Sequence, residues 1–167
     1  MALTDNLIAY WPLDELDGTR KDIYGGNHLT DVNNIKRSPG KIGWSGQFTS
    51  SASQYLYAND NANLSIANSD FTVAAFVYLD HVTTDLPRAI ATKWNTINDQ
   101  GEFILRRQSG IFVFFVSTTG SNSPYIALSV ASAVGWYLVV SQYNASASTI
   151  GLSINGAAVT ACAVTGS

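Results

Sequence analysis

The chain has 167 residues, of which 46% are hydrophobic and 13% are charged, and its formal net charge is −3. This length is typical of one domain with its own hydrophobic core, and the lack of a basic block argues against nucleic acid as a partner. No apolar run approaches the about 20 residues that a membrane-spanning helix needs. We therefore expect a single domain over residues 1–167.

Alternating apolar and polar residues predict a protein built almost entirely of β-strands. In chain order, the predicted strands cover residues 7–13, 46–50, 54–58, 71–79, 89–94, 102–108, 111–118, 125–130, 136–144 and 150–156. Turn-forming residues such as Gly25-Gly26-Asn27 and Asn155-Gly156 separate them. Many short strands at regular spacing predict an all-β sandwich or barrel.

The pattern inside two of these strands predicts how they pack. In residues 71–79, one face carries only Phe71, Val73, Ala75, Val77 and Leu79, and we expect it to face the core. Residues 111–118 are apolar on both faces, so we expect this strand in the middle of a sheet. Cys162 is the only cysteine, which excludes an intrachain disulfide, and we expect it to pack as a small hydrophobic side chain.

The aromatic residues divide into two groups by their position in the predicted strands. Those that follow the strand alternation are expected in the core: Tyr10, Trp11, Phe48, Phe71, Phe76 and Trp136. Those near strand ends or loops are candidates for an exposed face that stacks on a ligand: Trp44, Tyr57, Trp94 and Tyr125. These four are the predicted ligand-binding residues.

Carboxylates in the string Glu15-Leu16-Asp17 are the best candidates for catalysis, because residues i and i+2 of a strand project from one face. Two such carboxylates can serve a glycosidase as nucleophile and acid. However, Gly18-Thr19 is typical of a turn, and Arg20 stands where sandwich glycosidases carry a third acid. Glu102 is a further acid that we expect to face solvent. We therefore predict no catalytic residues and no enzyme.

The loop between residues 14 and 31 is a candidate for a structural calcium ion. It contains Asp14, Asp17, Asp22, Asn27 and Asp31. Calcium takes six to eight oxygen ligands from carboxylates, amides and carbonyls, and glycines allow carbonyls to converge. No EF-hand spacing is present, and the same residues also suit ordinary turns organised by aspartate and asparagine. Both interpretations remain open.

The order of the motifs resembles the laminin G-like, concanavalin A-type jelly-roll family in its bacterial and phage form. The matching segments are "LIAYWPLDE", "DIYGGNHLT", "GKIGWSGQF", "YLYANDNANLSIANSDFTVAAFVYLD", "IATKW" and "GWYLVVSQYN…IGLSINGAAV". The resemblance covers almost the whole chain. It implies an all-β fold of two stacked antiparallel sheets, a jelly-roll sandwich, with the concave face or the loop rim available for ligands.

The resemblance also implies a class of function. Members of this family are mostly non-catalytic modules that bind glycans or proteins, often with a structural calcium ion. Asp22 and Asn27 fall in the acidic, glycine-rich loop of the family and Asp14 follows the first strand, so these three residues are the predicted calcium ligands. After the "GKIG…F" strand this chain reads "TSSASQY" where members carry further acids.

The chain also departs from the family at its end. Members continue past the Asn155-Gly156 hairpin through two more strands, the last of which pairs with the opening strand, whereas this sequence ends at "VTGS". We therefore expect either a fragment of a longer parent chain or a subunit that a neighbouring chain completes by strand addition.

These observations predict a binding or adhesion module on an external surface. Because "MALTDNLIAY" lacks the basic and apolar regions of a secretory signal, we expect a phage virion component, such as a decoration, tail or fibre protein, that binds glycans or neighbouring virion subunits. The alternatives are a secreted bacterial carbohydrate-binding or adhesin module, a purely structural spacer and, less favoured, a glycan-active hydrolase or lyase. The expected location is the virion or the extracellular space.

Overall fold

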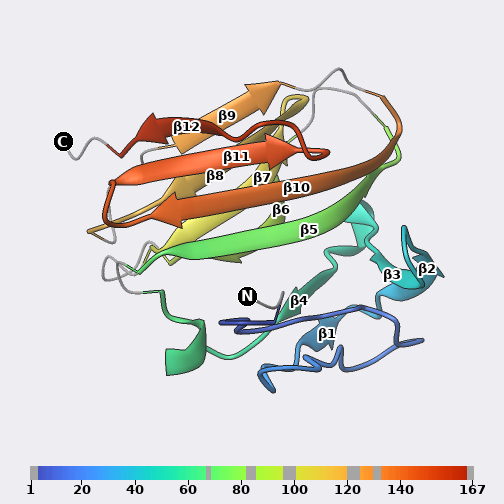
Figure 1. The fold of residues 1–167 in the computed structure, drawn as a ribbon. Coiled ribbons are helices and arrows are strands. Elements are labelled where there is room, and N and C mark those ends of the chain that lie inside the picture. Colours follow the sequence, from blue (N-terminus) through green and yellow to red (C-terminus); the bar gives the residue numbers. More distant parts are fainter. Residues whose placement is uncertain are drawn as a thin grey trace. The chain divides into compact units, whose positions relative to one another are not determined.

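The structure is a computed structural model of the chain, and it describes residues 4–66, 69–81, 86–95, 101–119, 125–129 (backbone) and 133–164. The fold contains antiparallel strands and two short 3-10 helices (Figure 1). It divides into two compact units, Met1–Ser65 and Ile66–Ser167, and each unit is described separately. The single domain over residues 1–167 stays a prediction.

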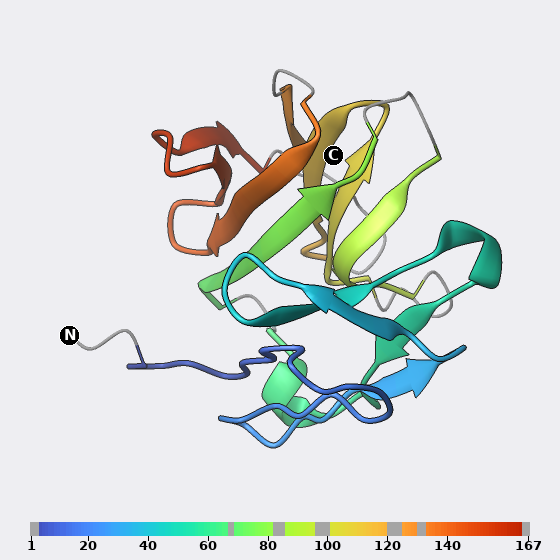
Figure 2. The same ribbon diagram turned by 90° about the vertical axis from the view of Figure 1, so that its right-hand side faces the viewer.

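The second unit is a sandwich of two four-stranded antiparallel sheets. The first sheet has the order β12-β11-β10-β5 and consists of β5 (Phe71–Leu79), β10 (Gly135–Asn144), β11 (Thr149–Ile154) and β12 (Thr160–Ala163). The second has the order β6-β7-β8-β9 and consists of β6 (Arg88–Lys93), β7 (Phe103–Gln108), β8 (Ile111–Val116) and β9 (Tyr125–Ser129). Figure 2 shows one sheet stacked on the other.

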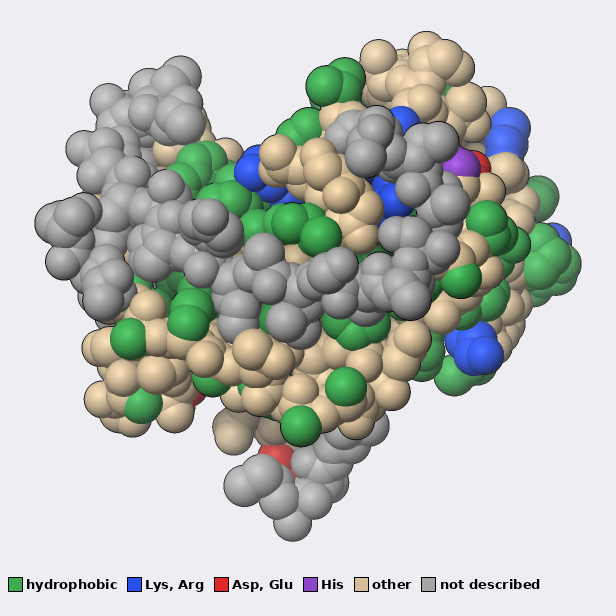
Figure 3. Space-filling model, turned by 90° about the horizontal axis from the view of Figure 1, so that it is seen from above, with side chains coloured by type: hydrophobic (Ala, Val, Ile, Leu, Met, Phe, Trp, Pro, Cys, Tyr) green, Lys and Arg blue, Asp and Glu red, His purple; other side chains and the backbone are tan. Residues whose placement is uncertain are grey.

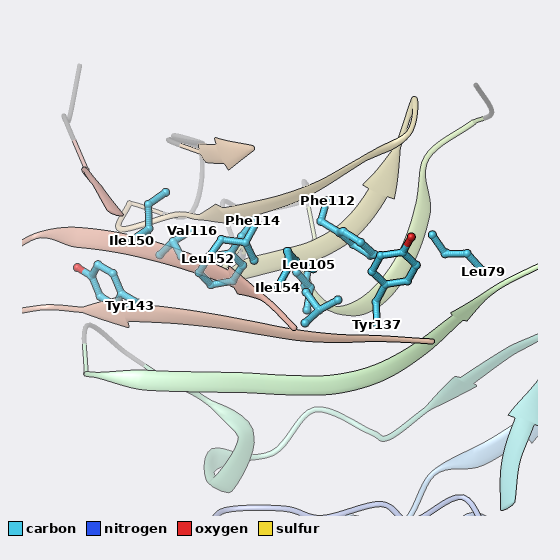
Figure 4. Packing of buried hydrophobic residues seen from close by; sticks show 11 residues of the cluster. Leu79, Leu105, Phe112, Phe114, Val116, Tyr137, Tyr143, Ile150, Leu152 and Ile154 are labelled. Atoms are coloured by element: carbon cyan, nitrogen blue, oxygen red, sulfur yellow. The ribbon is translucent and has the colours of Figure 1, made fainter. Parts of the chain in front are cut away.

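The hydrophobic core lies between these two sheets (Figure 4). From β7 and β8, Leu105, Phe112 and Phe114 point inward, and they meet residues of β10 and β11 such as Val139 and Leu152. All five side chains are fully buried. Burial of apolar area at about 25 cal/mol per Å² is therefore the main force that holds this unit together.

The packing predictions for this unit are confirmed. Strand β5 alternates along its whole length, and Phe71, Val73, Val77 and Leu79 pack on the core face. Strand β8 lies between β7 and β9, as its two apolar faces predict. Cys162 is half-buried against the core, in the manner of a small hydrophobic side chain.

The first unit consists of short elements. Strand β1 (Thr30–Val32) pairs with β4 (Tyr55–Tyr57), and β2 (Lys36–Pro39) pairs with β3 (Trp44–Gln47). The 3-10 helices are η1 (Ser50–Ala52) and η2 (Ala62–Leu64). Sequence alternation does not predict β1 and β2, because their residues, TDV and KRSP, contain almost no apolar side chain that could show a period.

Polar side chains organise this unit. Arg20 and Ile35 are both 0% exposed. The guanidinium of Arg20 donates to the carbonyls of Gly18 at 2.9 Å and Ile35 at 2.8 Å, and it forms an ion pair with Asp31 at 3.4 Å. A buried charge is tolerated only when it is paired and hydrogen-bonded, and Arg20 meets this condition through the nearby Gly18 and the more distant Asp31 and Ile35.

The predicted opening strand, residues 7–13, is wrong: the structure assigns no strand to this segment. The backbone N–H of Tyr10 donates to the side chain of Asp22 at 2.9 Å, and the carbonyl of Tyr10 accepts from the N–H of Ile23 at 3.0 Å. Pro12 has no N–H to offer a ladder, and Leu13 adopts a positive φ of 61° that turns the chain. The segment is therefore anchored to a loop instead of a sheet.

Candidate functional site

The loop around Asp22 is organised by its carboxylate, which is 3% exposed. Its Oδ1 accepts the backbone N–H groups of Tyr10, Tyr24 and Gly25 at 2.9, 3.0 and 3.0 Å. Its Oδ2 accepts the backbone N–H and the side-chain amide of Asn27, at 2.9 and 3.1 Å. Burial by itself would raise the pKa of the Asp22 carboxyl, but the four backbone donors outweigh that effect and hold its pKa well below the usual range.

The other predicted calcium residues are also engaged by donors of the chain. Asp14 accepts the N–H of Trp44 at 2.7 Å, and Asp31 accepts the N–H of Ile35 at 3.0 and 3.1 Å. The backbone carbonyl of Asn27 accepts the indole N–H of Trp11 at 2.7 Å. These contacts are those of acids and amides that organise turns, which is the second interpretation that the sequence left open.

The predicted calcium ligands Asp14, Asp22 and Asn27 do not converge on one point with free oxygens. Both oxygens of Asp22 face N–H groups, whose partial positive charge disfavours a cation at the same place. Among the described residues, no group of three or more His, Cys, Asp or Glu side chains is arranged to hold a metal ion. The geometry thus favours the turn role for Asp22, and the calcium site stays a prediction.

The three acids considered for catalysis lie in structural contacts or at the surface. Glu15 accepts the N–H of Lys21 through Oε1 at 2.8 Å, and Asp17 is exposed in the turn that follows. Glu102 forms an ion pair with Lys93 at 2.7 Å and accepts the N–H of Ile66 at 3.0 Å. Glu102 is therefore half-buried and paired, and the expectation that it faces solvent is wrong.

Trp44 lies at the exposed start of β3, as predicted for a ligand-binding residue, and 43% of it is exposed. The guanidinium carbon of Arg37 lies 3.9 Å above its ring centroid. The hairpin register explains this contact, because Arg37 pairs with Gly46 and Pro39 pairs with Trp44, so the two side chains share one face. Sequence reasoning missed Arg37, although the hairpin motif "KRSPGKIGW" would have placed it there.

Tyr57 is also exposed, and its ring lies 6.1 Å from that of Tyr55 on the same face of β4. Strand β4 pairs with β1, so that Thr30 lies opposite Tyr57 and Val32 lies opposite Tyr55. The two tyrosines form an aromatic pair of their own.

A third cluster lies on the outer face of the β6-β7-β8-β9 sheet. Arg106 is opposite Val113 in the register, and its guanidinium carbon lies 4.5 Å from the ring centroid of Phe115. Val113 itself is buried. The Nε of Arg106 is buried and has no hydrogen-bond partner within the described part of the chain. The Nε atoms of Arg20 and Arg107 are also buried and donate no hydrogen bond among the described residues, so this feature is shared by three arginines.

Two predicted ligand residues belong to this sheet. Trp94 is half-buried directly after β6, and alternation from Thr92, which is opposite Ile104 in β7, places it on the outer face. Tyr125 begins β9 and is opposite Phe115 in the register; its side chain lies outside the described residues. The sheet therefore brings the positions of Trp94, Arg106, Phe115 and Tyr125 to one face.

Several aromatic residues assigned to the core from sequence are exposed. Tyr10 is 52%, Phe48 is 50% and Phe76 is 48% exposed, so these three predictions are wrong. In β5, Phe76 belongs to the outer face because Phe71 and Val77 face inward. There it adjoins Tyr78, whose ring lies 5.4 Å from that of Trp136 in β10.

Figure 3 shows hydrophobic and basic side chains together, with few acidic ones among the described residues of that view.

Comparisons with known proteins bear on fold and family. A laminin G family model, described as the concanavalin A-like lectin/glucanases superfamily, matches residues 50–167. No curated protein matches the sequence with significance. Within the described residues, no helix has the length and hydrophobicity needed to cross a membrane.

Two solved structures illustrate the likeness of fold. The binding domain of botulinum neurotoxin DC in complex with rat synaptotagmin II aligns with a TM-score of 0.70 at 13% identity, over 98% of this chain and 41% of that chain. The same binding domain in complex with SialylT aligns with a TM-score of 0.57 at 12% identity, over 89% of this chain and 39% of that chain. This chain thus spans about two fifths of the solved chains it matches. The all-β, two-sheet antiparallel jelly-roll fold is confirmed.

Proposed function

The chain belongs to the concanavalin A-like lectin/glucanases superfamily, and on that basis we propose that it is a non-catalytic binding module whose ligand is a glycan. A protein surface is the alternative ligand. The solved binding domains of similar fold are in complex with synaptotagmin II in one case and with SialylT in the other, and these complexes support a binding role.

The observation that carries this proposal is the Arg106–Phe115 stack on the outer face of the β6-β7-β8-β9 sheet. A sheet face presents side chains in flat rows, and an aromatic ring there offers a surface for the C–H face of a sugar. Arg106 supplies donors held in place by the stack, and its buried Nε lacks an acceptor among the described residues. Trp94, at the end of β6, extends the same face.

A binding role is favoured over hydrolysis by the contacts of the acids. Glycosidases hold two carboxylates on either side of the scissile bond, about 5 to 9.5 Å apart. Glu102 instead binds Lys93 and the backbone of Ile66, while Glu15 binds the backbone of Lys21. Both oxygens of Glu102 and the Oε1 of Glu15 thus accept from donors of the chain, which is typical of acids that organise structure.

We place this module on an external surface, as a phage virion component such as a decoration, tail or fibre protein. The support is the low share of charged residues and the likeness of fold to solved binding domains. Detection of the protein in purified virions by mass spectrometry tests this placement, and its secretion by a bacterium free of virions would contradict it.

The binding proposal is tested with a glycan array, followed by calorimetry on the glycans that bind. The substitutions Trp94→Ala and Arg106→Gln are each expected to weaken binding at least about tenfold, because each removes a group worth about 1.4 kcal/mol or more. Tyr55→Ala is the matched control, since it removes an exposed aromatic ring from the other unit. Equal affinities for all three variants, or no glycan bound by the folded protein, would contradict the proposal.

A further inference from the structure

The β2–β3 hairpin (Figure 1) holds one basic and one aromatic side chain next to each other. Its tip is closed by a hydrogen bond from the N–H of Gly40 to the carbonyl of Gly43 at 3.0 Å. Gly43 has a φ of +62°, and a Cβ on Gly40 would lie 2.5 Å from the carbonyl oxygen of Trp44, so only glycine suits either position. Asp14, which lies outside the hairpin, accepts a hydrogen bond from the backbone N–H of Trp44.

Arg37 is held on this frame, and none of the acids in the described part of the chain forms an ion pair with it. Its guanidinium lies 3.9 Å over the Trp44 ring, and no described residue accepts a hydrogen bond from it. Stacking uses the flat face of a guanidinium and leaves the N–H groups on its edge free to donate. The donors of Arg37 are thus oriented before any ligand arrives.

The hairpin is basic within an acidic protein. No Asp or Glu occurs between Asp31 and Asp60, whereas this interval contains Lys36, Arg37 and Lys41. Two acids adjoin the hairpin: Asp14 accepts the N–H of Trp44, and Asp31, which pairs with Arg20, accepts the N–H of Ile35 directly before β2. The local charge is positive while the formal net charge of the chain is −3, which favours an anionic ligand here.

We propose that the Arg37–Trp44 pair is a second binding site, specific for an acidic glycan that carries carboxylate or sulfate groups. The edge of the Arg37 guanidinium matches the two oxygens of such a group and binds it with paired charge-assisted hydrogen bonds. The exposed part of the Trp44 indole packs against the sugar ring, and Lys41 at the hairpin tip adds long-range attraction.

A polysaccharide fits this hairpin better than an anionic membrane does. Membrane docking needs a broad apolar face, and the tip of this hairpin offers Ile42, which is 79% exposed, as its single aliphatic side chain. Arg37 is half-buried on the strand and away from the tip, where it suits one discrete anionic group. The site lies in the first unit and differs from the proposed site on the second sheet.

The test measures binding of a heparin-derived hexasaccharide to the full chain by calorimetry, with the desulfated, carboxyl-reduced hexasaccharide as the neutral comparison. Arg37→Gln is expected to weaken binding about tenfold or more, and Arg37→Lys about fivefold, because lysine cannot supply the planar fork. Lys21→Gln removes the same charge elsewhere in this unit and is expected to change affinity less than about twofold. Circular dichroism confirms that each variant is folded.

The outcomes separate this site from the alternatives. Loss of affinity in both arginine variants, with Lys21→Gln and Arg106→Gln unaffected, supports the proposal. Equal loss in Arg37→Gln and Lys21→Gln indicates diffuse charge attraction and overturns it, as does equal binding of the neutral hexasaccharide or no binding of either. Binding only to phosphatidylserine-containing vesicles, with the hexasaccharide unbound, also overturns it and assigns the hairpin to a membrane surface.

Discussion

Asp22 shows how one side chain can organise a loop. Its carboxylate joins residues 10, 24, 25 and 27 through N–H donors that would otherwise lack partners away from water. An ionised carboxylate accepts such hydrogen bonds about twice as strongly as a neutral group does. The low pKa of Asp22 and the shape of the loop therefore have the same cause.

The substitution Asp22→Asn is expected to lower the free energy of unfolding by about 2–4 kcal/mol, because the amide loses charge-assisted bonds and turns an NH₂ group toward N–H donors. Denaturant unfolding followed by circular dichroism at pH 7 measures this change. Asp17→Asn is the matched control, since Asp17 is exposed in the preceding turn.

The same residue predicts a pH dependence. Because the pKa of Asp22 is lower in the folded state than its ordinary 3.8, the unfolded chain binds a proton first as the pH falls. The stability that Asp22 contributes is thus present above about pH 4 and is lost as the pH decreases below it. Asp22→Asn should flatten this part of the stability curve, and an unchanged curve would contradict the role assigned to the carboxylate.

At the scale of the element, β5 shows that strand alternation takes precedence over residue type. Val77 packs on the core while Phe76, its neighbour and the larger hydrophobic side chain, is 48% exposed on the outer face. Successive side chains of a strand point to opposite faces, so one of the two must lie outside whichever register is chosen. Phe76 is outside because its register partner Leu138 is also on the outer face of β10, whose core residues are Tyr137 and Val139.

This arrangement predicts opposite tolerance at adjacent positions. Val77→Lys should lower the free energy of unfolding by more than about 3 kcal/mol, because it places an unpaired charge in the sandwich. Phe76→Lys should cost less than about 1 kcal/mol, because its ammonium group remains in water. Urea unfolding of the two variants provides the comparison, and equal destabilisation would mean that the outer face of β5 is also packed.

At the scale of the whole molecule, the two units differ in what stabilises them. The unit of residues 66–167 has an apolar core between two sheets, whereas the described part of the first unit buries Arg20, Asp22 and Asn27 with Ile35 as its one buried hydrophobic side chain. Hydrogen bonds and an ion pair therefore carry more of the stability in the first unit.

Whether calcium stabilises the protein can be tested through its melting temperature. Because Asp22 is already satisfied by N–H groups, we expect the melting temperature to change by less than about 1 °C when EDTA is added, with the same result after adding calcium chloride. Differential scanning fluorimetry makes the measurement, with magnesium chloride as the control for ionic strength. A rise of several degrees specific to calcium would restore the metal site predicted from sequence.

The sequence by itself determined the strands of the second unit other than β12, and the inward face of β5. Both follow from a two-residue period, which is a local property that any strand must obey to bury one face. The exposed position of Trp44 was also predictable from a local property of the sequence, because this residue lies at a strand end beside turn-forming glycines. Resemblance to the laminin G-like family then identified the sandwich.

Only the tertiary structure decided what the loop carboxylates and the arginines do. Asp14 meets Trp44 across thirty positions, and Tyr10 meets Asp22 across twelve, so no local pattern could assign these oxygens to N–H donors in place of calcium. The same holds for Arg20, Arg37 and Arg106, whose partners are set by hairpin register and loop closure. Period and composition reveal which side chains are buried, whereas the chemistry of a site depends on which distant groups the fold brings within hydrogen-bonding distance.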